Sequence, residues 1–107
     1  MVNATFVKDS KDNIIEFRIL GHAGFAEHGS DIVCAAVSVL ALNTINSIEK
    51  FSNSSFKGEA DDGLVRFEFI SDIDTESSVL VNSLLLGLQS IEEEYGTKYI
   101  KIRFEEV

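Results

Sequence analysis

Two residues of known reactivity, His22 and Cys34, lie in one glycine-bearing segment, Gly21-His22-Ala23-Gly24-Phe25-Ala26-Glu27-His28-Gly29-Ser30-Asp31-Ile32-Val33-Cys34. A cysteine thiolate is a strong nucleophile, and a neighbouring imidazole can take up its proton and later return it. The pair is therefore a candidate for nucleophilic catalysis, with Cys34 as the nucleophile and His22 as its base.

Cys34 also has an ordinary structural explanation. It is the only cysteine, so it forms no internal disulfide, and this agrees with a reducing compartment such as the cytoplasm. A cysteine among small apolar residues is usually a buried hydrophobe; here the neighbours are Ile32, Val33, Ala35, Ala36 and Val37. Residue types alone leave open a buried thiol, a thiol redox sensor and a catalytic nucleophile.

The elements on either side of the segment decide whether the pair can meet. Alternation of apolar residues predicts strands over residues 2–7 and 14–20, which form a hairpin. Residues 21–30 have no periodicity and are predicted to be a loop.

A helix is expected from Asp31 to about residue 51, capped by Ser30 or Asp31. Its apolar stripe consists of Val33, Val37, Leu40, Thr44, Ile48 and Phe51. Cys34 would then lie near the helix start, where free N–H groups and the helix dipole favour a thiolate and can stabilise an oxyanion.

The rest of the chain predicts a second hairpin and a second helix. Strands over 56–60 and 64–70 flank the turn Asp61-Asp62-Gly63. Asp72 or Asp74 caps a helix that ends at Gly96, with the stripe Val81, Leu84, Leu88, Ile91 and Tyr95, and a strand over 99–105 follows. The order β-β-α-β-β-α-β predicts an α/β (α+β) fold, a two- or three-layer sandwich of about five mixed or antiparallel strands with two helices.

Composition limits the class of protein. With 107 residues, 45% of them apolar, the chain is expected to form one domain spanning residues 1–107. Its 18 acidic and 9 basic residues give a formal charge of -9, which argues against direct nucleic-acid binding and favours basic partners. Its apolar stretches are interrupted within about ten residues and its N-terminus lacks a secretion signal, so neither a membrane span nor export is expected.

The motif around the reactive pair closely resembles that of a known family. The string Gly21-His22-Ala23, then Gly29, then Asp31-Ile32-Val33-Cys34-Ala35-Ala36-Val37-Ser38 is similar to the signature of the ribosomal-processing cysteine proteases. The resemblance implies a compact α/β sandwich that forms homodimers and needs no metal or organic cofactor. It also implies a cytoplasmic endopeptidase that removes the N-terminal extension of bacterial large-subunit ribosomal protein twenty-seven, cutting after two phenylalanines that precede a small residue.

The same resemblance makes Cys34 and His22 catalytic and places Gly21, Gly29, Asp31 and Ser38 in the active-site neighbourhood. Two of these supporting residues, Ser38 and Asp31, also have a structural explanation. The Ser38 hydroxyl can orient a reacting group or can bond back to the carbonyl of Cys34. Asp31 can orient His22 or can serve as an acidic residue at a helix N-terminus.

Other interpretations of the segment fit less well. His28 is a competing base, but nothing in the predicted loop holds it in place. The spacing of His22, His28, Asp31 and Cys34 matches no common zinc pattern. The glycines fit no phosphate-binding fingerprint, and no lysine follows Gly29. The alternative function is a non-enzymatic, acidic, ribosome-associated binding module in which the cysteine is buried.

Overall fold

The computed structural model describes residues 1–21, 28–61 and 63–107, and for residues 28–31 it describes the backbone alone. The predicted order of elements is confirmed. The elements are β1 (Val2–Lys8), β2 (Ile14–Leu20), α1 (His28–Phe51), β3 (Phe56–Asp61), β4 (Leu64–Phe69), α2 (Thr75–Tyr95) and β5 (Ile100–Glu106).

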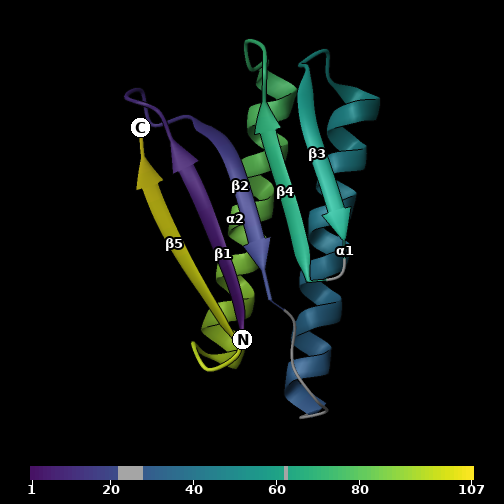
Figure 1. Ribbon diagram of the computed structural model, residues 1–107, viewed down its shortest axis with the longest axis vertical. Helices are drawn as coiled ribbons and strands as arrows, with labels where there is room; N and C mark the ends of the chain where they lie inside the picture. Colours follow the sequence, from purple (N-terminus) through teal and green to yellow (C-terminus); the bar gives the residue numbers. More distant parts are fainter. Residues whose placement is uncertain (22–27, 62) are drawn as a thin grey trace.

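The strands form one mixed sheet in the order β3-β4-β2-β1-β5. All neighbouring strands are antiparallel except β1 and β5, which run parallel. Both helices lie on the same face of the sheet, so the sandwich has two layers (Figure 1). The α/β (α+β) prediction is confirmed, and of the two architectures left open the two-layer one is found.

Aromatic side chains form the centre of the core. Phe6, Phe17 and Phe67 are opposite one another on β1, β2 and β4 and are fully buried. Their ring centroids are 6.0 Å apart for Phe6 and Phe17 and 5.0 Å apart for Phe17 and Phe67. Such aromatic pairs each contribute about 0.5–1.5 kcal/mol beyond the area they bury. This row fixes the register of three strands, because a slip of one residue would turn the rings to the solvent face.

The helices cover this core with the stripes expected from the sequence, with two exceptions. On α1, Val33, Val37, Thr44 and Ile48 are buried as predicted, but Phe51 is 63% exposed. The prediction for Phe51 was wrong because it is the last residue of α1, beyond the last buried position of the stripe at Ile48. On α2, Tyr95 is likewise exposed at the end of its helix, whereas Val81, Leu84 and Leu88 are buried.

Helix α1 requires a correction to the membrane prediction. Its segment Ile32–Phe51 spans 20 residues with a mean hydropathy of 1.6, which is long and apolar enough to cross a membrane by length and composition. The expectation that apolar stretches are too short for this was wrong. The helix nevertheless packs against the sheet and α2, with a Cβ placed on Gly87 of α2 lying only 3.1 Å from Leu40. Core helices of soluble proteins have the same character.

The N-terminus of α2 is fixed by Asp74, one of the two predicted caps. Its Oδ1 accepts a 2.9 Å hydrogen bond from the amide of Ser77, and its Oδ2 accepts one of 2.8 Å from the amide of Asn53. The bonds from the amides of Asn53 and Ser77 lower the pKa of Asp74 from its usual 3.8 to about 2. Asp74 thereby joins the start of α2 to the segment that follows α1.

Candidate active site

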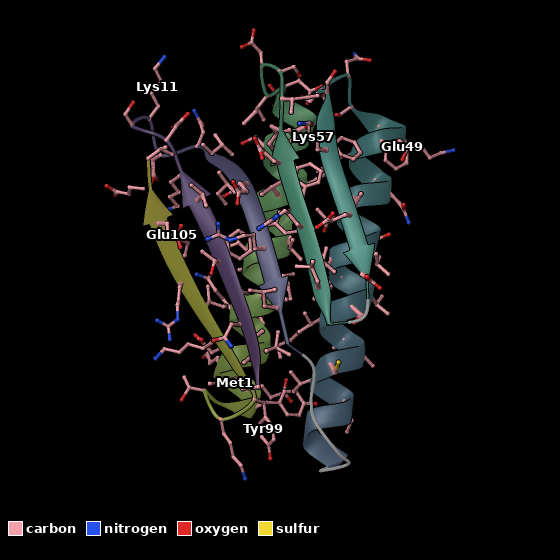
Figure 2. The ribbon with its side chains drawn as sticks, in the orientation of Figure 1. Met1, Lys11, Glu49, Lys57, Tyr99 and Glu105 are labelled. Carbon is pink, nitrogen blue, oxygen red and sulfur yellow. The ribbon has the colours of Figure 1, made fainter. Side chains whose placement is uncertain are left out.

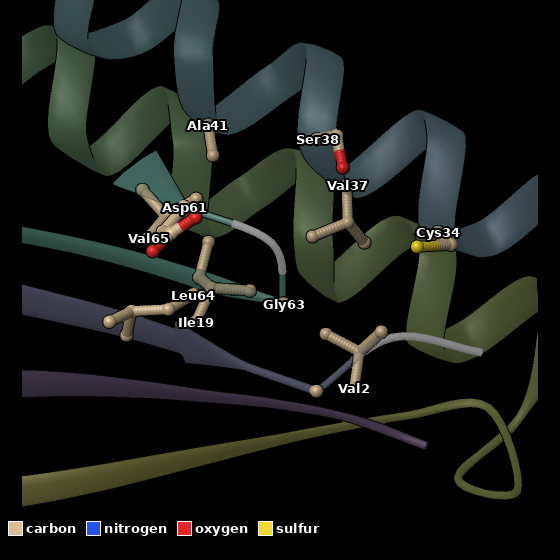
Figure 3. Close-up of a pocket in the computed structure, with 11 residues that line it drawn as sticks. Val2, Ile19, Cys34, Val37, Ser38, Ala41, Asp61, Gly63, Leu64 and Val65 are labelled. Carbon is tan, nitrogen blue, oxygen red and sulfur yellow. The ribbon is translucent and has the colours of Figure 1, made fainter. Parts of the chain in front are cut away.

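A cavity of about 180 Å³ opens between the first half of α1 and the ends of the central strands. Figure 3 shows α1 on one side of this cavity and the sheet on the other. We call it the Cys34 cavity, and it is lined by Val2, Ile19, Gly21, Cys34, Val37, Ser38, Ala41, Asp61, Gly63, Leu64 and Val65. Most of these side chains are aliphatic, so the cavity has an apolar floor and a few polar groups.

Cys34 is half-buried and lines this cavity. Figure 3 shows its sulfur near Val37 on the side of α1 that faces the sheet. A thiol sealed in the core, which the sequence left open, is therefore not what the structure contains. The sulfur lies where a group that enters the cavity can reach it.

The position of Cys34 within its helix differs from the prediction. Helix α1 begins at His28, not at Asp31, so neither Ser30 nor Asp31 caps it and residues 28–31 form its first turn. A capping side chain contributes only about 1 kcal/mol, and extending an existing helix adds one hydrogen bond for each residue fixed. The strongest cap in the sequence therefore need not mark the first residue of the helix.

Because α1 starts earlier, the expectation that free N–H groups and the helix dipole favour a thiolate at Cys34 is weakened. Only the first four N–H groups of a helix lack an intrahelical partner, and the dipole effect falls off within the first turn. Cys34 lies in the second turn, so its own amide belongs to the helix interior. The free amides of α1 belong to residues 28–31, one turn before the sulfur.

Ser38 lies one turn after Cys34 and lines the same cavity. The structural explanation required its hydroxyl to bond back to the carbonyl of Cys34. Two other helical hydroxyls do so in their own helices, Thr44 to Leu40 at 2.8 Å and Ser90 to Leu86 at 3.0 Å. Within the described part of the chain, Ser38 makes no hydrogen bond of this kind and its side chain is exposed.

Gly21 closes the cavity at the end of β2 and has to be glycine. Its φ is +90°, a conformation that favours glycine, and a Cβ there would lie 2.5 Å from the carbonyl oxygen of Met1. Its amide donates a 2.8 Å hydrogen bond to the carbonyl of Gly63. Figure 2 shows Met1 and Tyr99 together at this end of the molecule.

The remaining predicted residues are only partly described. His22 lies outside the described residues, so its distance from Cys34 stays a prediction. Gly29 and Asp31 lie in the first turn of α1, but nothing is described of the Asp31 or His28 side chains. Over the described residues, no group of three or more His, Cys, Asp or Glu side chains is arranged to hold a metal ion.

Sequence reasoning missed one whole wall of the site. The β3–β4 hairpin contributes Asp61, Gly63, Leu64 and Val65 to the cavity, and β1 contributes Val2. The sequence identified Asp61-Asp62-Gly63 only as a turn. Its position opposite α1 follows from the strand order, which places β4 beside β2, and local sequence does not determine that order.

The site can be compared with those of known proteins. The chain is 33% identical over 102 residues to the ribosomal processing cysteine protease Prp of Bacillus subtilis (strain 168), covering 89% of this chain and 90% of that protein. It is 30% identical over 99 residues to the protein of the same name from Staphylococcus aureus (strain Mu50), covering 90% and 92%.

A solved structure shares the fold. It is the essential ribosomal processing protease Prp from S. aureus in complex with a covalently linked product peptide, with a TM-score of 0.88 and 25% identity, covering 98% of this chain and 100% of that one. In addition, the family model described as "Cysteine protease Prp" matches residues 1–101. The chain that carries Cys34 in this cavity therefore belongs to the cysteine protease Prp family.

Proposed function

We propose that this protein is a cysteine endopeptidase that removes the N-terminal extension of bacterial large-subunit ribosomal protein twenty-seven, with Cys34 as the nucleophile and His22 as the general base and acid. The observation that carries the proposal is a half-buried cysteine whose sulfur faces a cavity, in a chain of the cysteine protease Prp family. We further propose that residues 1–107 act as one protease domain.

The reaction proceeds in two steps. His22 removes the proton of Cys34, and the sulfur attacks the carbonyl carbon of the scissile bond, so that a C–S bond forms and the carbonyl oxygen becomes an oxyanion. When the oxyanion collapses, the C–N bond breaks and His22 gives its proton to the leaving amine. Water, deprotonated by His22, then attacks the thioester and releases Cys34. No metal or organic cofactor is needed for these steps.

Two observations support this chemistry. The S. aureus relative is described with a covalently linked product peptide, which agrees with covalent catalysis in the family. The Ser38 hydroxyl lies one turn from the sulfur on the same wall and is directed to no partner among the described residues, so it is available to a reacting group. Gly29 and Asp31, in the first turn of α1, would support the site from its N-terminal side.

The dimensions of the cavity fit the expected substrate. An apolar cavity of about 150 Å³ is enough to hold a benzene molecule. The Cys34 cavity, at about 180 Å³ and mainly aliphatic, therefore has room for one phenylalanine ring of a processing site that contains two. The formal charge of -9 also favours encounter with a basic ribosomal protein.

The direct experiment is incubation of the enzyme with the full-length extended ribosomal protein, followed by mass spectrometry of the products. We expect one cut, after two phenylalanines and before a small residue. An intact substrate after prolonged incubation, or cuts at unrelated positions, would contradict the proposed substrate. The non-enzymatic binding module would bind the ribosomal protein and leave it whole.

The choice of base is tested by two histidine variants. We expect His22→Ala to lose nearly all cleavage and His28→Ala to keep most of it. The rate of reaction of Cys34 with iodoacetamide near neutral pH should fall in the His22 variant only. Equal losses in both variants would leave the choice of base open again.

We propose that the protein acts in the cytoplasm as a homodimer. The outer faces of the helices support a second copy as the partner, because residues 32–48 of α1 and 77–91 of α2 contain no charged side chain in a chain with a formal charge of -9. Two copies can therefore meet there without bringing like charges into contact, and Val39 and Leu86 are about two-thirds exposed on this surface. We expect a dimer by analytical ultracentrifugation and a monomer after Leu86→Lys.

A further inference from the structure

Asp61 is the one described residue of the Cys34 cavity that carries a formal charge. It is the last residue of β3 and is paired with Leu64 at the start of β4. Figure 3 shows it on the sheet side of the cavity, away from Cys34, which lies on α1. Cys34 and this carboxylate therefore lie on opposite walls of one cavity.

We propose that Asp61 is a specificity-determining residue that favours substrates with a cationic side chain, lysine or arginine, near the scissile bond. This inference rests on the proposed peptidase function. The aliphatic side chains of the cavity can select for size and apolarity, but they cannot favour a positive side chain over a neutral one. A carboxylate attracts a cation and repels an anion, and this supplies the missing discrimination.

Strand β3, which carries Asp61, is paired along its length with β4, and a specificity residue requires such support. The ladder between β3 and β4 continues to its last pair, Asp61 and Leu64. Immediately after it, Gly63 accepts the 2.8 Å hydrogen bond from Gly21 at the end of β2. The carboxylate therefore lies on an ordered element with a defined position relative to the cavity.

The ordinary explanation is that Asp61 is an exposed acidic residue at the end of an edge strand and has no role in substrate choice. Glu59 provides the matched comparison, because it is an exposed carboxylate on the same strand, two residues earlier. It borders a separate depression, formed with Lys57, Gly58, Arg66 and Glu68, and not the Cys34 cavity. Loss of either carboxylate changes the net charge of the protein by the same amount.

The experiment uses a set of peptides of equal length built around a site of two phenylalanines and a small residue. A single lysine, or a glutamine in the matched peptide, is placed at each position around the scissile bond in turn. We expect the wild-type enzyme to prefer lysine at one or two adjacent positions by about two- to fivefold in kcat/KM, the range for an exposed ion pair.

Asp61→Asn should lose that preference, and Glu59→Gln should keep it. The effect should appear in KM and not in kcat, because the charge is held equally in the bound substrate and in the transition state. Added salt should reduce the preference of the wild-type enzyme.

Three results would overturn the inference: no position at which lysine is preferred, a preference that Asp61→Asn retains, or an equal loss in both variants, which would assign the effect to net charge. Each of these leaves Cys34-dependent cleavage of the glutamine peptides intact. Failure of the proposed function is different, since none of the peptides would then be cut, or Cys34→Ala would cut them as well.

Discussion

The amide of Gly21 donates a 2.8 Å hydrogen bond to the carbonyl of Gly63, and this bond joins the end of β2 to the β3–β4 hairpin. Both glycines line the Cys34 cavity. Gly21 also precedes His22, the proposed base, in the sequence. The hydrogen bond thus joins the last described residue before His22 to the wall that carries Asp61.

Gly21→Ala is expected to destabilise the protein and to lower activity. Positive φ alone costs a residue with a side chain about 1–3 kcal/mol. The new Cβ would in addition lie 2.5 Å from the backbone oxygen of Met1, which cannot move without shifting β1. Gly96→Ala is the matched control, because Gly96 has a φ of +95° and nothing within 4 Å of the added Cβ.

Thermal unfolding of the two variants separates the cost of a positive φ, which both share, from the cost of the close contact with Met1, which only Gly21→Ala makes. We expect both to melt below the wild-type protein, Gly21→Ala by clearly more, and only Gly21→Ala to lose peptidase activity. Equal shifts in Tm would mean that the Met1 carbonyl yields easily, and full activity in Gly21→Ala would remove this glycine from the site.

Ser38→Ala is expected to lower kcat/KM by about two- to tenfold, the effect of losing one ordinary hydrogen bond. The physical reason is that its hydroxyl faces the cavity and has no hydrogen-bond partner among the described residues. Stability should change little, since the side chain is exposed. Ser90→Ala is the control, because that hydroxyl is bonded to Leu86 on α2; its activity should match the wild type. Unchanged kinetics in Ser38→Ala would leave Ser38 without a role.

Asp74 should make stability dependent on pH in the acid range. Its pKa is lowered in the folded state to about 2, so its contribution is complete above its usual value of 3.8 and is lost as the pH falls through about 2. We expect Asp74→Ala to lower Tm by several degrees at pH 7, and the gap from the wild type to close between pH 4 and pH 2.

The control for this variant is Asp72→Ala, whose carboxylate accepts no hydrogen bond among the described residues. Its Tm should stay near that of the wild type across the same range. A gap for Asp74→Ala that persists unchanged at pH 2 would show that the carboxylate charge is not what stabilises the start of α2.

The order of elements could be predicted because local patterns determine it. The alternation of Val2, Ala4 and Phe6 and the helical spacing of Val81, Leu84 and Leu88 each require a buried face, and all six residues are buried. Strand order could not be predicted in the same way. The parallel pairing of β1 with β5 joins residues that lie at opposite ends of the sequence, and no local pattern encodes it.

The residues of the candidate site differ in the same way: local spacing predicts the positions of some of them, and the positions of others depend on strand order. Cys34 and Ser38 could be placed on one wall because helical spacing brings residues four apart together. Asp61 and Leu64 could not be placed opposite them, because that depends on where the β3–β4 hairpin lies in the sheet. The start of α1 was missed by three residues, because capping preference is weak compared with the gain from continuing a helix.

The central claim is that the Cys34 thiol performs the attack. The most direct test compares wild-type protein with Cys34→Ala on the full-length extended ribosomal protein, with mass spectrometry of products and of the enzyme. We predict that the variant folds with a Tm near that of the wild type, makes no product, and carries none of the thioester adduct trapped on the wild-type enzyme. Cleavage by Cys34→Ala at the wild-type rate would contradict the account.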